Sequence, residues 1–288
     1  MKTCVSSYSY RDVLNSGEMN QIELMSFVKE VGFDGIEFTD LSPVNGMTEL
    51  EFAYRLREES EKIGLPIVNH TIGADFINCD SFDEQIEKLF KKVDIAEALG
   101  ASGMRHDATG GFRDERKSYC TFDDALPILA KGCRMVTEYA AQKGVKTMIE
   151  NHGFFCQDST RVEKLVHEVA HPNFGLLVDI GNFLCADDPS VLAVGRVAAF
   201  AKHVHIKDFH VKDGSGDNPG KGFFKSRGGN YLRGAIVGHG NVPVRQCISI
   251  LKANGYDGYL SIEFEGMEEP KNGIATGLEN LKRYIELA

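Results

Sequence analysis

Short apolar runs alternate with longer segments in which apolar residues recur every three or four positions along nearly the whole chain. The short runs are rich in β-branched and aromatic residues and predict strands, whereas the spacing in the longer segments predicts helices. The predicted strands span residues 4–10, 34–39, 65–72, 101–107, 145–151, 173–180, 202–209 and 258–265. The predicted helices span residues 19–31, 48–63, 82–99, 122–143, 159–170, 189–200, 243–254 and 274–287. Glycine directly follows several of these helices, as is typical of a helix C-terminus.

Eight strand–helix units predict a (β/α)8 TIM barrel formed by a single domain over residues 1–288. Strands that alternate with helices pair in parallel, because each crossover returns the chain to the same end of the sheet. A doubly wound open sheet is the structural alternative. That fold usually has a glycine-rich first turn, and SSYSYRD at residues 6–12 contains no glycine.

The composition limits the possible binding partners but says little about the fold. The net charge is −10 and the sequence pI is about 5.4, which argues against nucleic acid and anionic membranes, because both bind clustered cations. The seven cysteines are widely spaced and form no CxxC motif, so we expect reduced thiols in a cytoplasmic protein. No signal peptide or membrane-spanning stretch is apparent. The sequence leaves open whether the protein forms a homo-oligomer.

Polar and ionisable residues collect where the predicted strands end, which is where TIM barrels carry their active sites. These residues are Glu37, Asn69, His70, Arg105, His106, Asp107, Glu150, Asn151, His152, Asp179, His205, Lys207, Asp208, Glu263 and Glu265. Any one of them alone is more simply a hydrogen-bonded or loop-facing residue. Converging carboxylates, however, repel one another unless a cation neutralises them. Glu150, Asp179, His205 and Glu263 offer three oxygens and one nitrogen, which predicts a divalent cation, Mn²⁺ first, with Mg²⁺ or Co²⁺ as alternatives.

Six motifs, in order, carry a resemblance to a known family. They are GFDGIEF (32–38), MIENHG (148–153), LLVDIGNF (176–183), HVHIKD (203–208), GHGNVPV (238–244) and GYDGYLSIEFEG (255–266). With them the chain resembles the xylose-isomerase-like TIM barrels of the sugar phosphate isomerase/epimerase superfamily. That superfamily includes ketose 3-epimerases, hydroxypyruvate isomerase, inosose dehydratase and endonuclease IV.

The resemblance also implies roles for particular residues. It places the family's metal ligands on the same four positions, and it implies that Glu150 and Glu263 are the catalytic pair that removes and returns a proton α to a carbonyl. The chain departs from the ketose epimerases at Asn182, where those enzymes have a histidine that contacts the substrate. This departure weakens the case for a free ketose as substrate and leaves the metal site unaffected.

Seven residues near the strand ends are predicted to bind the substrate. They are His70, Arg105, His106, His152, Asn182, Lys207 and His239. For His106 the alternative is a histidine on a surface loop, and for His152 it is a residue that orients a metal ligand. For Lys207 it is a structural ion pair with Asp208 or Glu263.

Residues 209–240 form a long glycine-rich segment after the seventh strand, and we expect it to be a lid or rim over the barrel mouth. Lys221, Lys225, Arg227 and Arg233 in this segment could receive an anionic substrate. An oligomer contact or a solvated loop is the alternative.

The sequence favours a metal-dependent isomerase or epimerase of a small carbohydrate. The second hypothesis is a lyase of a keto-sugar, keto-inositol or 3-keto C-glycoside, which His106 or His152 would favour because it could protonate a leaving group. An endonuclease IV-like phosphodiesterase needs more metal ligands and a basic groove. A non-catalytic sugar-binding barrel is less favoured, because all four predicted ligands are present.

Overall fold

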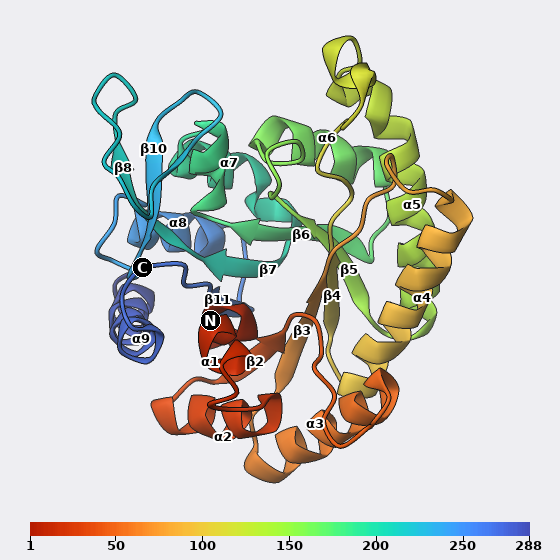
Figure 1. Ribbon diagram of the computed structural model, residues 1–288, viewed down its shortest axis with the longest axis vertical. Coiled ribbons are helices and arrows are strands. Elements are labelled where there is room, and N and C mark those ends of the chain that lie inside the picture. The colour runs from red at the N-terminus through yellow and green to blue at the C-terminus, as the bar shows by residue number, and fades with distance from the viewer.

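Eight parallel strands close into a barrel in the computed structural model, which describes residues 1–288 (Figure 1). The order around the barrel is β1-β11-β7-β6-β5-β4-β3-β2, so the first strand pairs with the last. The barrel strands are β1 (Lys2–Ser6), β2 (Gly35–Phe38), β3 (Ile67–Ile72), β4 (Gly103–His106), β5 (Lys146–Glu150), β6 (Phe174–Asp179), β7 (Ala201–Ile206) and β11 (Tyr259–Ile262). The predicted single-domain (β/α)8 fold is confirmed.

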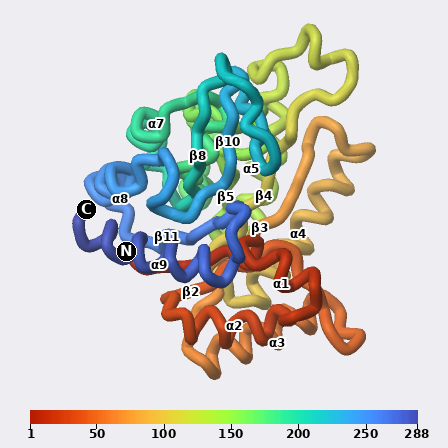
Figure 2. Tube along the Cα trace, turned by 60° about the vertical axis from the view of Figure 1, so that its left-hand side comes forward, coloured from red at the N-terminus to blue at the C-terminus, as the bar shows by residue number.

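Helices surround the barrel and cover its outer face (Figures 1 and 2). They are α1 (Arg11–Asn15), α2 (Gln21–Val31), α3 (Glu49–Ile63), α4 (Phe82–Leu99), α5 (Phe122–Gln142), α6 (Ser159–Val169), α7 (Ser190–Val197), α8 (Val244–Ala253) and α9 (Pro270–Leu287). Between strands and helices lies one apolar core of 62 buried residues. None of the helices combines the length and the apolar character needed to span a membrane.

The first predicted strand is longer than the observed one. Strand β1 ends at Ser6, and residues 7–10 form a 3-10 turn that leads into α1. The aromatic side chains in this stretch serve packing instead of strand pairing, since Tyr10 is fully buried with its ring 5.8 Å from that of Phe27. The local composition therefore suggested extended backbone where tertiary packing dictates a turn.

The segment after β7 contains a small antiparallel sheet of its own. Its strands are β8 (Asp208–Lys212), β9 (Phe224–Lys225) and β10 (Tyr231–Ala235), in the order β8-β10-β9, and β8 and β10 project beyond the barrel (Figures 1 and 2). The Asp208 carboxylate anchors the base of this sheet by accepting hydrogen bonds from the backbone N–H groups of Phe209, Gly238, Gly240 and Val242. The sequence predicts a long loop here, because most of its glycines lie between the two longer strands and separate them in the chain.

Candidate metal centre and active site

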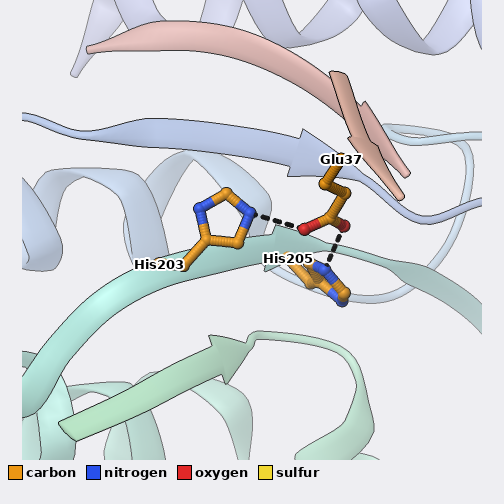
Figure 3. A group of neighbouring side chains, drawn as sticks. All are labelled: Glu37, His203 and His205. Carbon is orange, nitrogen blue, oxygen red and sulfur yellow. Dashed lines mark hydrogen bonds and ion pairs between the residues drawn. The ribbon is translucent and has the colours of Figure 1, made fainter. Parts of the chain in front are cut away.

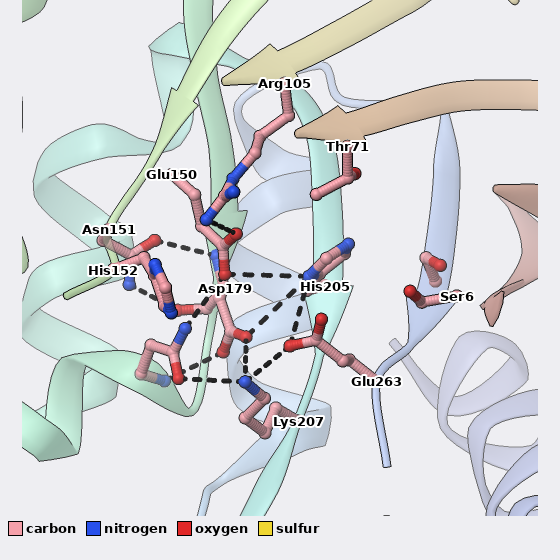
Figure 4. A network of polar contacts seen from close by, with 12 residues as sticks. Ser6, Thr71, Arg105, Glu150, Asn151, His152, Asp179, His205, Lys207 and Glu263 are labelled. Carbon is pink, nitrogen blue, oxygen red and sulfur yellow. Dashed lines mark hydrogen bonds and ion pairs between the residues drawn. The ribbon is translucent and has the colours of Figure 1, made fainter. Parts of the chain in front are cut away.

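Four side chains from neighbouring strands meet inside the mouth of the barrel (Figure 4). Glu150 ends β5, Asp179 ends β6, His205 lies in β7 and Glu263 directly follows β11. Each offers one atom to a group in which all atoms lie within 4.8 Å of one another, and all four residues are buried. His205 Nδ1 lies 3.6 Å from Glu263 Oε2, 3.8 Å from Glu150 Oε1 and 3.9 Å from Asp179 Oδ2.

Two atoms of this cluster point to a cation. His205 Nδ1 and Asp179 Oδ2 are buried and have no hydrogen-bond partner, although buried polar atoms are nearly always paired. Burial, together with the nearby Glu150 and Glu263 carboxylates, raises the pKa of Asp179 to about 6. Three carboxylates and one imidazole nitrogen form a donor set that suits a divalent cation. The residues present therefore fit the group that the sequence predicts.

Two buried cationic side chains flank the cluster. Lys207 Nζ lies 2.5 Å from Glu263 Oε2 and 3.4 Å from Asp179 Oδ2, and Arg105 Nη2 lies 2.7 Å from Glu150 Oε2. Burial opposes the charge of Lys207, but these carboxylates raise its pKa well above the ordinary value. Both cations are thus held by the protein's own carboxylates.

Asparagines fix the orientation of two members of the cluster. The Asn182 side chain donates to Glu150 Oε1 at 2.9 Å, and the Asn182 backbone N–H donates to Asp179 Oδ1 at 2.8 Å. Asn151 exchanges two hydrogen bonds with the backbone of Asp179, at 2.8 and 2.9 Å, and so ties the end of β5 to the end of β6 (Figure 4). Asn182 therefore has a clear role in shaping the site.

One imidazole at the mouth is accessible. His152 Nδ1 lies 3.1 Å from Asp107 Oδ1, and about half of the His152 side chain (49%) is exposed. Burial alone would lower the pKa of His152, but its hydrogen bond to Asp107 raises it above the ordinary value. Arg105 also contacts Asp107, at 2.9 Å. The result is a histidine–carboxylate pair beside the four-residue cluster.

A further buried carboxylate lies behind His205. Glu37 Oε1 is 2.5 Å from His205 Nε2, and Glu37 Oε2 is 2.9 Å from His203 Nε2 (Figure 3). Burial would raise the pKa of Glu37, but the two histidines hold it well below the ordinary value. This contact joins β2 to β7 across the barrel interior, between strands that are not neighbours.

A cavity of about 290 Å³ opens above the cluster. Its lining residues are Tyr8, Thr39, Asp40, Thr71, Ile72, Gly73, Arg105, Glu150, His152, Lys207, Glu263 and Glu265. Only two of these twelve are hydrophobic. A small, polar cavity of this kind suits a ligand that is rich in hydroxyl groups.

The sequence of this chain matches a known family. The sequence profile of the xylose isomerase-like TIM barrel matches residues 25–284. The chain belongs to the xylose isomerase-like TIM barrel family. This barrel family falls in the sugar phosphate isomerase/epimerase superfamily, as the sequence motifs predicted.

Several proteins resemble this xylose isomerase-like barrel in sequence or in fold. An inosose dehydratase from Clostridium perfringens (strain 13 / Type A) is 24% identical over 96% of this chain and 92% of its own length. The structure of an L-ribulose 3-epimerase aligns over 99% of this chain and 97% of its own, with 18% identity and a TM-score of 0.71. The IOLI protein, solved with a bound zinc atom, covers 100% of this chain and 99% of its own, with 17% identity and a TM-score of 0.74.

The structure brings most of the predicted site residues of this xylose isomerase-like barrel together. Arg105, Glu150, His152, Lys207 and Glu263 line the cavity, with Asp179, Asn182 and His205 directly behind them. The exposed His239 does not line the cavity.

Two of the predicted substrate-binding histidines lie away from the cavity. The Nδ1–H groups of His70 and His106 donate to the backbone carbonyls of Phe38, at 3.2 Å, and Asp107, at 2.8 Å. Burial lowers the pKa of both histidines to about 4. They are buried, neutral side chains with structural partners.

The cations of the 209–240 segment are also absent from the cavity lining. Arg227 pairs with Asp158 at 2.9 Å. Lys225 lies over the ring of Tyr231, and Arg233 lies over that of Phe223. Lys221 is exposed. These contacts brace the small sheet.

The sequence places Glu37, Asn69 and Asp107 at predicted strand ends, but its pattern assigns them no role. The two-residue alternation of a strand could have indicated that Asn69 faces the barrel interior together with Glu37. Asn69 bonds Glu37, and Thr71 lines the cavity, so His70 between them must face outward. No local pattern indicates the contact between Asp107 and His152.

Proposed function

We propose that this protein is a divalent-metal-dependent lyase, which removes the proton α to the carbonyl of a keto-sugar or keto-cyclitol and expels a β-hydroxyl. The observation that carries this proposal is the accessible His152–Asp107 pair beside the four-residue cluster. A β-elimination needs a group that can take up a proton and deliver one to the leaving oxygen, and a histidine does both near neutral pH. Similarity to an inosose dehydratase supports the same reaction class.

The contacts of His152 suggest how it would act. Its Nδ1–H donates to Asp107, so Nε2 is the nitrogen that can accept the α proton. The same nitrogen then gives a proton to the departing hydroxyl, and the products are an unsaturated ketone and water. Asp107 holds the ring in place and stabilises the imidazolium that forms between the two steps.

Glu150, Asp179, His205 and Glu263 would hold the cation. When bound, a divalent cation polarises a substrate carbonyl and stabilises the charge that develops on its oxygen. The oxygen-rich donor set favours Mn²⁺ or Mg²⁺, and the zinc atom bound to the IOLI protein adds Zn²⁺ as a candidate.

We further propose that the substrate is uncharged. Arg105 and Lys207, the cations of the cavity, are already paired with carboxylates. Asp40 and Glu265 also line the cavity, where they would repel a phosphate or a sugar acid. Hydroxyl groups in the lining, such as that of Thr71, suit a neutral polyol instead.

An isomerase or epimerase is the second candidate. Glu150 and Glu263 both line the cavity from separate strands, so they could act on the two faces of a substrate. Glu150, however, is ion-paired with Arg105, and, although burial would raise the pKa of Glu263, the ion pair with Lys207 lowers that pKa and makes Glu263 a weaker base. The similarity to L-ribulose 3-epimerase keeps this reaction in view.

Incubation with neutral keto-inositols and keto-sugars in D₂O tests the proposal. An unsaturated ketone, seen by ultraviolet absorbance and mass spectrometry, is expected from at least one substrate. Deuterium at the α-carbon without loss of water would identify the epimerase instead. Turnover of sugar phosphates or sugar acids in preference to neutral substrates would contradict the proposed substrate class.

A further inference from the structure

The Glu37 carboxylate is completely buried beneath the ligand cluster, in the interior of the barrel. Its Oε1 atom lies 2.5 Å from His205 Nε2 and accepts a hydrogen bond of 3.1 Å from the Ser261 hydroxyl. Its Oε2 atom lies 2.9 Å from His203 Nε2 and accepts one of 3.3 Å from the Asn69 amide. Both oxygens are thus approached by two groups each, which fixes the orientation of the carboxylate.

This arrangement determines which nitrogen of His205 carries the proton. An ionised carboxylate only accepts hydrogen bonds, so the neutral His205 ring must be protonated at Nε2. Its Nδ1 atom then presents a lone pair toward the oxygens of Glu150, Asp179 and Glu263, at 3.6 to 3.9 Å. Three carboxylate oxygens facing this nitrogen favour positive charge between them, which either a proton on Nδ1 or a bound cation supplies.

We infer that Glu37 is a positioning residue of the metal centre: it holds His205 in the tautomer and orientation that coordinate the cation through Nδ1. Carboxylates that accept the remaining N–H of a ligand histidine fix the ring and increase its basicity, and their loss typically costs 10- to 100-fold in metal affinity. The inference rests on the metal dependence proposed above, but it is independent of which reaction the enzyme catalyses.

The histidine tautomer is the first test, and the unaltered protein suffices for it. Long-range ¹H–¹⁵N correlation spectra of histidine-labelled protein loaded with Zn²⁺ should show His205 protonated at Nε2 alone. Addition of Zn²⁺ should move the Nδ1 resonance most. A proton on Nδ1 of the neutral ring, or zinc binding at Nε2, would overturn the inference.

Metal affinity of two variants is the second test. Glu37→Gln keeps the size of the side chain and removes its charge, and it should weaken Zn²⁺ binding, measured by competition with a chelator, by about 10- to 100-fold. Ser261→Ala is the matched control, because it removes one hydrogen bond to the same oxygen and keeps the carboxylate. The control should stay within about threefold of the original affinity.

A Glu37→Gln affinity within about threefold of the original would also overturn the inference. Thermal unfolding of both variants without metal checks that they fold. If Glu37→Gln does not fold, the tautomer of the unaltered protein decides alone. Both readouts are independent of turnover, so a failure to find the proposed lyase product leaves them unchanged, and a failure of the Glu37 role leaves the product assay unchanged.

Discussion

The histidines of β7 and the histidines at the ends of β3 and β4 are buried at similar depth, yet their surroundings differ completely. His205 lies among carboxylates, with Glu37 on one ring nitrogen and the ligand cluster near the other. His70 and His106 each have a backbone carbonyl on one nitrogen and no partner on the other. Ionisable neighbours, and not burial, therefore separate a candidate metal ligand from a structural histidine.

The same contrast extends to charge. The pKa of His205 is raised well above its ordinary value, since the surrounding carboxylates outweigh the effect of burial. Burial lowers the pKa of His70 and His106, because no carboxylate offsets it sufficiently. The carboxylates around His205 thus favour its charged form, whereas the surroundings of His70 and His106 favour the neutral form.

Removal of one cluster carboxylate should have the largest effect. Glu150→Gln replaces a charged ligand with a neutral one, and we expect turnover to fall by more than about 1,000-fold, with much of the bound metal lost. Metal analysis after dialysis and a turnover assay measure this. Glu265→Gln, which alters a cavity carboxylate outside the cluster, should cost less than about tenfold. Unchanged turnover in Glu150→Gln would remove the basis of the proposed mechanism.

The accessible histidine should have the second-largest effect. His152→Gln removes the proposed proton carrier, and turnover should fall by about 10²- to 10⁴-fold. Metal content should stay unchanged, because His152 is outside the cluster. His167→Gln makes the same substitution at an exposed position on α6 and should leave turnover unaltered. A loss below about threefold in His152→Gln would favour the two glutamates as the proton-transfer groups.

The strand-end rule predicted the cluster well because it depends on chain direction alone. Glu150 and Asp179 end their strands, and parallel strands bring their carboxyl ends together in any closed barrel. The rule says nothing about which side of a strand a residue faces. Arg105 and His106 are consecutive, so only one of them can point into the barrel, and it is Arg105.

Contacts between distant strands escaped prediction for a different reason. Glu37 in β2 reaches His205 in β7, and two other barrel strands separate them. Nothing in the local sequence around Glu37 encodes its partner, because the shape of the whole barrel sets that distance. The small sheet that begins at Asp208 was missed because its strands are short and β8 and β10 are separated by the long glycine-rich stretch between them.

Stability at low pH should sharpen the contrast between the two kinds of histidine. The pKa of His70 is about 4 in the folded protein, below the value of about 6.5 in an unfolded chain. Between these values the unfolded chain binds more protons, so the free energy of unfolding falls as the pH falls from about 6.5 toward 4. By pH 5, His70 should account for about 1–2 kcal/mol of that loss.

Denaturant unfolding of His70→Asn at several pH values measures this contribution. The asparagine amide can donate to the Phe38 carbonyl in place of Nδ1–H, and it does not titrate. The smaller side chain lowers the free energy of unfolding equally at every pH, so the two proteins are compared only by how steeply this free energy changes with pH. The variant should lose less stability than the original protein between pH 7 and 5. Equal slopes would mean that His70 is not neutral in the folded state.

The smallest effect should come from the rim. His239 is exposed and outside the cavity, and the backbone of its loop is held by Asp208, which accepts from the N–H groups of Gly238 and Gly240. His239→Ala should therefore change turnover by less than about twofold and the free energy of unfolding by less than about 0.5 kcal/mol. A larger loss of turnover with unaltered stability would mean that this loop closes over the substrate, and the active site would then extend from the barrel mouth onto the rim.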